Sequence, residues 1–178
     1  MIITSTTAEQ EALLSAAKAM CAAARTAPKT KGIDRIDTMI LTGEEKDALA
    51  DKMDQLADSL SMGFFHRDAG NVRASQAVVL IGCESAPNGL NDACRFCGFE
   101  NCKDSYESGA RCFFNTVDLG IAVGSAVSIA ADRRIDNRVM FSVGRTAMEM
   151  KLMGDKICQI LGIPLSLSGK SPFFDRAK

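Results

Sequence analysis

The sequence contains no tryptophan, one tyrosine and one histidine, so it offers few aromatic platforms on which nucleic-acid bases stack. It also lacks an excess of charge of either sign. The 21 Lys and Arg and the 22 Asp and Glu residues are mixed along the chain and leave a formal net charge of −1. This balance argues against nucleic acids and anionic membranes as partners, because both require a basic patch.

Long hydrophobic runs are also missing. The N-terminal stretch MIITSTTAEQ has neither the basic residues nor the apolar run of an export signal. The longest apolar tract, near residues 121–131, is shorter than the roughly 20 residues that a membrane-spanning helix needs. We therefore expect a cytoplasmic protein without a membrane partner.

Apolar periodicity, capping patterns and turn residues predict alternating helices and strands without repeats or linkers. The predicted helices cover residues 8–25, 43–63, 117–131 and 139–150, and the predicted strands cover residues 37–41, 76–82 and 157–163. The strand over 76–82 is a continuous β-branched run, which is typical of a strand buried on both faces. The pattern indicates a single α+β or α/β domain over residues 1–178, with a cysteine-rich segment inserted at 83–112.

Seven cysteines are present, and they are unevenly distributed. The stretch CRFCGFENC at residues 94–102 contains three of them, and a fourth follows ten residues later, giving the spacing C-x2-C-x4-C-x9-C. These four residues are Cys94, Cys97, Cys102 and Cys112. In a reducing compartment, crowded cysteines are more often metal ligands or redox groups than disulfides.

Three thiolates from one tight loop suit a compact 4Fe–4S cluster, because each iron needs one sulfur ligand. Gly98 lets the backbone approach such a cluster and direct N–H groups at it. Zinc is the alternative metal, although structural zinc sites usually combine two separated C-x2-C pairs and this segment has one. Unmetallated thiols are a third interpretation. The scattered Cys21 and Cys158 lie in apolar runs and are expected to be core thiols.

The motif C-x2-C-G-F-x-x-C at residues 94–102 resembles the small 4Fe–4S domain of the B subunit of the Rnf electron-transport complex and of the corrinoid iron–sulfur protein. In those proteins the last ligand lies further downstream than Cys112 does here. The resemblance therefore leaves Cys83, at the end of the buried strand, as a substitute for Cys112.

The whole chain resembles a family of prokaryotic proteins described as uncharacterised proteins containing a ferredoxin-type domain. The blocks that carry this resemblance are AARTAPKTKGID at 23–34, FFHRDAGNVRASQAVVLIG at 64–82, CRFCGFENC at 94–102, VDLGIAVGSAV at 117–127 and GIPLSLSGKSPFFDR at 162–176. The resemblance implies a cluster and an electron-transfer role with a redox partner protein of unknown identity. It names no reaction, so catalytic residues stay unassigned and an oxidoreductase activity stays open.

Residues 27–32 are similar to the A-P-S-x-x-N segment of the flavin-dependent nitroreductases, with Lys29 in place of Ser and Gly32 in place of Asn. This resemblance implies a nitroreductase-like fold and an FMN-dependent reductase as the alternative function. It also implies a homodimer, which the apolar stretch at 120–131 favours.

If FMN binds, Arg25, Lys29 and Lys31 would supply donors for its phosphate. The alternative is that these cations simply complement the helix C-terminus before Pro28. His66, the only histidine, has no second catalytic group fixed beside it in sequence and is expected to be structural.

Overall fold

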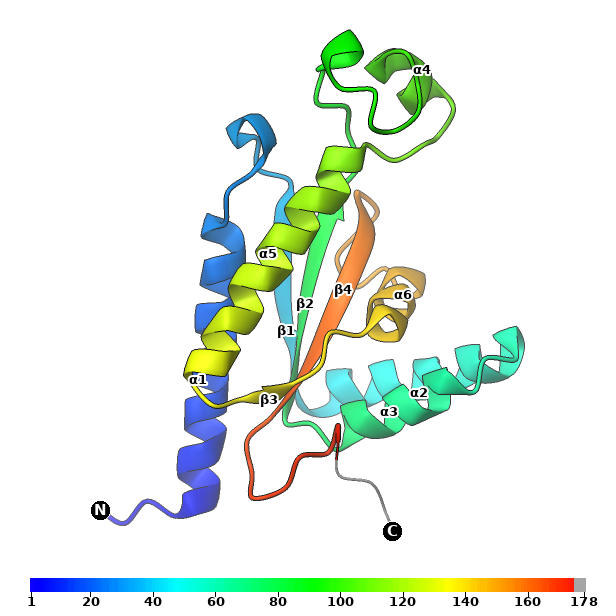
Figure 1. Cartoon of the computed structure of the whole chain (residues 1–178). Coiled ribbons are helices and arrows are strands. Elements are labelled where there is room, and N and C mark those ends of the chain that lie inside the picture. Colours follow the sequence, from blue (N-terminus) through cyan, green and yellow to red (C-terminus); the bar gives the residue numbers. More distant parts are fainter. Residues whose placement is uncertain (175–178) are drawn as a thin grey trace.

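The computed structural model describes residues 1–174 and contains a four-stranded sheet covered by helices on both faces (Figure 1). The strands lie in the order β1-β2-β4-β3, and every neighbouring pair is antiparallel. Their bounds are Ile36–Leu41 for β1, Ala77–Glu84 for β2, Asp136–Asn137 for β3 and Ile157–Ser166 for β4. The two long central strands therefore form the centre of the molecule.

Strand β2 has core residues on both faces, as its continuous apolar run predicts. Ala77, Val79 and Ile81 belong to the core between the sheet and one pair of helices, α1 (Ser5–Thr26) and α5 (Phe113–Asp132). Val78 and Leu80 belong to the core on the opposite face. That core is closed by α2 (Gly43–Leu60), α3 (Phe64–Arg73) and α6 (Phe141–Glu149).

Three short elements occupy the ends of the sheet: the 3-10 turns η1 (Thr30–Gly32) and η2 (Asn91–Ala93), and helix α4 (Cys102–Glu107). The segment between β2 and α5, which includes η2 and α4, projects beyond the sheet at the top of Figure 1. The sheet thus ends where the cysteine-rich segment begins, and α5 leads the chain back along the sheet.

The predicted helices and strands are found close to their expected positions, with differences at their ends. Helix α1 begins earlier than expected, because Thr4 caps it by accepting from the Thr7 amide at 3.3 Å. Strand β4 extends three residues further than expected, through Pro164. Helix α3 was not predicted, since its sequence FFHRDAGNVR contains a central glycine and few apolar residues.

Helix α5 is longer than the predicted helix because it begins at Phe113, directly after Cys112. Among residues 1–174 it is the one helix whose length and composition suffice to cross a membrane, with a mean hydropathy of 1.5, so the expectation that no apolar segment is long enough was wrong. Its inner side packs against α1 and β2, as the core helix of a globular protein does.

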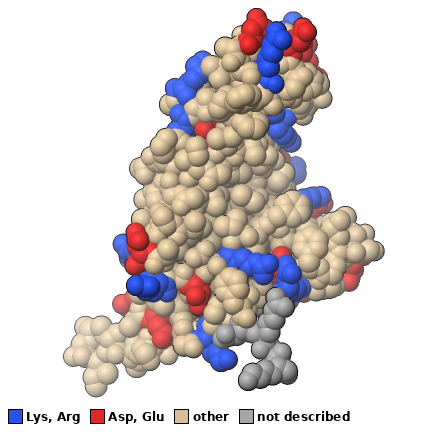
Figure 2. Space-filling model, in the orientation of Figure 1, with Lys and Arg blue, Asp and Glu red and all other residues tan. Residues whose placement is uncertain are grey.

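The outer side of α5 is apolar and carries small side chains. Gly120, Ile121 and Gly124 are exposed there, and Ile121 is 40% exposed. The centre of the face shown in Figure 2, over α5, is free of Lys, Arg, Asp and Glu side chains, which gather towards the two ends of the molecule. An uncharged helix face of this kind is available for contact with another protein surface.

His66 on α3 joins two carboxylates on α2. Its Nδ1 lies 2.6 Å from Asp54 Oδ1, and its Nε2 lies 3.0 Å from Asp58 Oδ1. Hydrogen bonds to these two carboxylates raise the pKa of His66 above 6.5, and the one to Asp54 has the larger effect. The expectation of a structural histidine therefore agrees with these contacts, which clamp α3 to α2.

The His66 clamp predicts a pH-dependent stability. Because the folded-state pKa is raised, the stabilisation is fully present below the unfolded-state value near 6.5 and is lost as the pH rises through the folded-state pKa. We expect His66→Gln to lower the thermal midpoint below about pH 6 and to have little effect above about pH 9. Thermal unfolding of both proteins across this range measures the difference, and a constant difference at all pH values would contradict the clamp.

Candidate iron–sulfur centre and its surroundings

The four predicted ligands lie in the loop between β2 and α5 and line one small cavity of about 20 Å³. We call this the four-cysteine cavity, after Cys94, Cys97, Cys102 and Cys112. Apolar rings of Phe99, Phe113 and Phe114 also line it. The spacing in sequence therefore corresponds to four thiols that face a common space.

Tight backbone turns present the first two thiols. Arg95 and Gly98 both have positive φ angles, of 53° and 85°, and the Gly98 amide donates to the Arg95 carbonyl at 3.0 Å. Positive φ at Gly98 has no steric cost, because glycine lacks a Cβ. The chain thus turns tightly over residues 95–98, and Cys94 and Cys97 both line the cavity.

Amide and hydroxyl groups point at several of the sulfur atoms. The Asn91 amide donates to Cys102 Sγ at 3.4 Å, and the Cys102 amide donates back to Asn91 Oδ1 at 3.2 Å. The pKa of Cys97 is lowered by a hydrogen bond from the Phe99 backbone amide and by one from the Ser105 side chain. Donors of this kind stabilise negative charge on sulfur, which is the form that binds metals.

Asn88 connects Cys112 to two cations. It is 4% exposed, and its Nδ2 donates to Cys112 Sγ at 3.6 Å. Its side-chain oxygen accepts from Arg35 Nη1 at 2.7 Å, and its backbone carbonyl accepts from Lys31 Nζ at 3.0 Å. Sequence reasoning missed Asn88, because Arg35 and Lys31 lie more than fifty residues away from it along the chain. The arrangement places positive charge behind the fourth thiol.

Helix α5 adds a further electrostatic contribution at Cys112. This residue is the N-cap of α5, and its side chain accepts no hydrogen bond from the helix. The amide end of a helix carries partial positive charge, and Cys112 lies at this end of a 20-residue helix. Asn115, in the first turn, holds the preceding loop by accepting from the Ala86 amide at 3.1 Å.

The donor set and its surroundings fit an iron–sulfur cluster: four thiols, N–H donors towards sulfur and an apolar cover of phenylalanines. Among residues 1–174, no group of three or more His, Cys, Asp or Glu side chains is already arranged around one metal position. The convergence of the four sulfur atoms on one cluster therefore stays a prediction.

Cys83, the substitute for the fourth ligand, lies elsewhere. It is fully buried in β2 and is not among the residues that line the four-cysteine cavity. Its Sγ lies 3.5 Å from Gln159 Oε1 on β4. The geometry favours Cys112 over Cys83. Of the two expected core thiols, Cys21 is half-buried, and burial raises its pKa; Cys158 is half-buried too and lines a second cavity.

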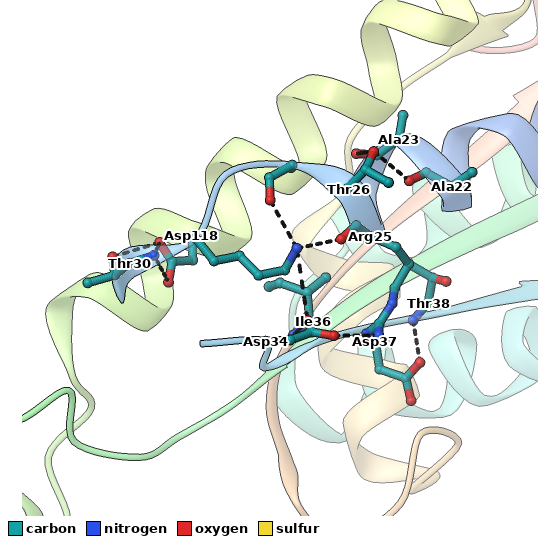
Figure 3. A network of polar contacts seen from close by, with 12 residues as sticks. Ala22, Ala23, Arg25, Thr26, Thr30, Asp34, Ile36, Asp37, Thr38 and Asp118 are labelled. Carbon is teal, nitrogen blue, oxygen red and sulfur yellow. Dashed lines mark hydrogen bonds and ion pairs between the residues drawn. The ribbon is translucent and has the colours of Figure 1, made fainter. Parts of the chain in front are cut away.

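The three cations expected at a flavin phosphate each have a partner within the chain. Arg25 forms an ion pair with Asp34, shown in Figure 3. Lys29 is 8% exposed and donates to carbonyl oxygens at the end of α1, including that of Ala27 at 2.9 Å. Lys31 reaches Asn88, as described above. The contacts of Lys29 match the alternative in which a cation complements the helix end, whereas Arg25 and Lys31 are held by groups outside the helix.

A network at the same helix end fixes η1 onto α5. Asp118, on α5, accepts from the Thr30 amide at 3.1 Å and from the Thr30 hydroxyl at 2.9 Å (Figure 3). Asp118 is buried, so these contacts satisfy a carboxylate that would otherwise be costly to bury. The network holds the segment that carries Lys31 beside the cysteine loop.

Comparison with known proteins gives two sequence matches. The family model described as "Uncharacterized protein containing a ferredoxin domain (DUF2148)" matches residues 108–176, which include Cys112 and begin after Cys102. A protein of Archaeoglobus fulgidus, described as an uncharacterized protein, is 40% identical over 178 residues, covering 95% of this chain and 94% of its own. The family resemblance read from the sequence is thereby confirmed.

Solved structures of nitroreductases share the fold. Nitroreductase CinD of Lactococcus lactis in complex with nicotinic acid is 13% identical, with a TM-score of 0.58 over 93% of this chain and 84% of its own. A putative NADH dehydrogenase/NAD(P)H nitroreductase of Bacteroides thetaiotaomicron is 12% identical, with a TM-score of 0.57 over 88% and 74%. The FMN and NADPH-dependent nitroreductase NfnB of Sphingopyxis is 11% identical, with a TM-score of 0.59 over 92% and 83%. The predicted nitroreductase-like fold is confirmed.

Proposed function

The chain belongs to the family of uncharacterised proteins that contain a ferredoxin domain, and we propose from this that it is an electron-transfer protein whose four-cysteine cavity holds a 4Fe–4S cluster. The observation that carries the proposal is the lining of one cavity by four thiols in the C-x2-C-x4-C-x9-C spacing. A bound cluster would accept and release single electrons.

The chain's own residues would set the properties of this centre. Cys94, Cys97, Cys102 and Cys112 would supply the four ligands. The amides of Asn91 and Phe99 would stabilise negative charge on two of the sulfur atoms, and Asn88 would do so at the fourth ligand. The phenylalanines would keep water away from the centre.

Anaerobic purification with iron, sulfide and zinc analysis, followed by electron paramagnetic resonance, tests the proposal. We expect a brown protein with about four irons and four sulfides per chain and a paramagnetic signal on reduction. A colourless protein with one zinc per chain would contradict the cluster. It would favour the alternative function, an interaction module in which the four cysteines bind a structural zinc.

FMN is a second cofactor to test, since the FMN and NADPH-dependent nitroreductase NfnB has the same fold. Arg25 is the cation of the flavin set that lines the large polar cavity of about 690 Å³ beside the start of β1 and the start of β4. In this variant of the proposal, an FMN bound near Arg25, Lys29 and Lys31 would pass electrons to or from the cluster. A yellow, iron-free protein would instead favour a flavin reductase with peripheral cysteines.

We further propose that the protein is cytoplasmic and forms a homodimer, and the apolar outer face of α5 supports the homodimer. We expect light scattering to give twice the mass of the chain, and Ile121→Lys to shift the protein towards the monomer because it places a charge in the interface. A mass equal to that of one chain for the wild-type protein at working concentrations would contradict the proposed homodimer. A redox partner protein would then bind elsewhere, for example at the exposed tip of the cysteine loop.

The phenylalanines near the cavity predict how fast the cluster is lost in air. Phe99 lines the cavity, whereas Phe96 is 64% exposed and packs outside it on Phe113, with ring centroids 5.2 Å apart. We expect Phe99→Ala to bleach roughly threefold or more faster than wild type, because water reaches the centre, with normal anaerobic assembly. Phe96→Ala is the matched control. Equal bleaching rates in the wild type and both variants would mean that Phe99 does not protect the cluster.

A further inference from the structure

Strands β2 and β4 bring two further cysteines together beside the cysteine loop. Cys83 pairs with Gln159, and Glu84 pairs with Ile157, so Cys158 is an extra residue of β4 without a partner in the ladder. Such β-bulges redirect a side chain and are frequent next to active sites. Here the Cys158 thiol donates to the Cys83 carbonyl oxygen at 3.3 Å, so the two cysteines are in direct contact across the strands.

The two thiols differ in access. Cys83 is fully buried, whereas Cys158 lines an open cavity of about 360 Å³ together with Arg111 and Lys156. Asp155 also lines this cavity, but its carboxylate is paired with Lys151 at 2.8 Å. The volume lies within the range of about 300–1,000 Å³ that small-molecule sites occupy. The lining therefore carries two cations and the Cys158 thiol, and the buried Cys83 contacts Cys158 from the neighbouring strand.

The two thiols also differ in acidity. The neighbouring Cys83 side chain, the charge of Arg111 and the Ser85 side chain together lower the pKa of Cys158. The same contact with Cys158, together with burial, raises the pKa of Cys83. The Cys83 carbonyl oxygen accepts from the Cys158 thiol and so favours the protonated form of Cys158. The lowered pKa of Cys158 therefore depends on the Cys83 side chain and on Arg111. The pair has the asymmetry of an attacking thiolate and a resolving thiol.

We propose that Cys158 and Cys83 form a dithiol site that reduces small anionic disulfides in the Arg111–Lys156 cavity. The Cys158 thiolate attacks one sulfur of the disulfide, forms a mixed disulfide and releases the first thiolate. Cys83 then loses its proton to the second departing thiolate and attacks Cys158, which releases a second thiol. One disulfide thus becomes two thiols, while the Cys83 and Cys158 thiols become one disulfide.

This exchange needs only the two thiols, so it stands whether or not the four-cysteine cavity carries a cluster. Ser85, Tyr106 and Ala110 line both the Cys158 cavity and a second cavity bordered by Cys97, Cys102 and Cys112. The dithiol site therefore lies next to the proposed redox centre.

The test uses the full chain, purified anaerobically and mixed with one equivalent of dithiobisnitrobenzoate, an anionic disulfide whose thiolate product is coloured. We expect two coloured thiolates per disulfide consumed and a peptide pair linked through Cys83 and Cys158 by mass spectrometry. Cys83→Ser should release one thiolate and retain the adduct on Cys158. The serine hydroxyl can donate to Gln159 as the thiol does, so this variant should fold.

Two further variants separate this site from the other cysteines. Cys158→Ser should lose the fast phase and the linked peptide, whereas Cys21→Ser, which alters another half-buried thiol, should keep both. Arg111→Gln should slow the reaction about tenfold with dithiobisnitrobenzoate and clearly less with neutral dithiodipyridine, because the cation attracts the anionic reagent.

Two outcomes would overturn the proposal. One is a wild-type protein whose fast product links cysteines of the four-cysteine cavity in place of Cys83 and Cys158. The other is a Cys158→Ser variant that reacts as fast as wild type. Neither outcome bears on iron content, so failure of this site and failure of the proposed cluster are read from separate measurements.

Discussion

Replacing Cys112 by alanine should leave a folded protein that keeps less than about a tenth of the wild-type iron. Loss of a residue that hydrogen-bonds a ligand typically lowers metal affinity about 10- to 100-fold, and loss of the ligand itself should lower it further. Cys112 is the N-cap of α5 but accepts no hydrogen bond from the helix, so the substitution removes no capping hydrogen bond. Iron and sulfide analysis after anaerobic reconstitution measures the loss, and thermal unfolding without iron checks that the fold is kept.

Cys83→Ala is the matched control, since the sequence offers Cys83 as the other fourth ligand. Cys83 is buried against β4 and contacts Gln159, away from the four-cysteine cavity. We expect this variant to keep the wild-type iron content and to lose about 1 kcal/mol of stability through the small cavity that it leaves. Loss of iron in Cys83→Ala with retention in Cys112→Ala would reverse the assignment of the fourth ligand.

Much of the candidate site can be predicted from the sequence because its ligands are local. Three of the four cysteines occur within nine residues, so their spacing alone indicates a shared centre. The surrounding contacts depend on the fold instead. Asn88 meets Arg35 and Lys31 across more than fifty residues, and no local pattern marks these pairs.

The contact between Cys83 and Cys158 could not be predicted from the sequence either. Cys83 and Cys158 lie in separate strands, and their contact depends on the antiparallel register of β2 with β4 and on one bulge in it. A shift of one residue would turn either side chain to the other face of the sheet. The apolar run around Cys158 therefore predicted an ordinary core thiol, and Cys83 was expected only as a substitute for the fourth ligand. The strand pairing is what reveals their contact and the cavity that Cys158 faces.

The fold follows the sequence where periodicity is strong and departs from it where tertiary packing decides. The buried strand β2 and the helices α1, α2 and α5 follow their apolar patterns. Helix α3 depends on contacts with α2, including those of His66, because its own sequence favours a helix only weakly. Long-range contacts thus explain the element that the pattern omitted.

Two glycines allow α6 to approach β4 closely. Gly144 faces the backbone of Ile160: a Cβ at this position would lie 1.8 Å from the Ile160 carbonyl oxygen and 2.5 Å from its carbon. Gly162 lies under Val143 in the same way, with a Cβ that would come within 2.1 Å of a Val143 methyl group. Ile160 also belongs to the core between α6 and the sheet.

Gly144→Ala should therefore be among the most destabilising single substitutions in the chain. The added methyl group meets backbone that cannot rotate away, so α6 must move off β4 and open the core beneath it. We expect a loss of about 3 kcal/mol or more, which lowers the thermal midpoint by roughly 6–12 °C for a chain of this length. Gly70→Ala in α3 is the matched control, since nothing lies within 4 Å of its Cβ and alanine favours the helix by up to about 1 kcal/mol. Equal midpoints for the two variants in thermal unfolding would mean that α6 does not rest on β4 through Gly144.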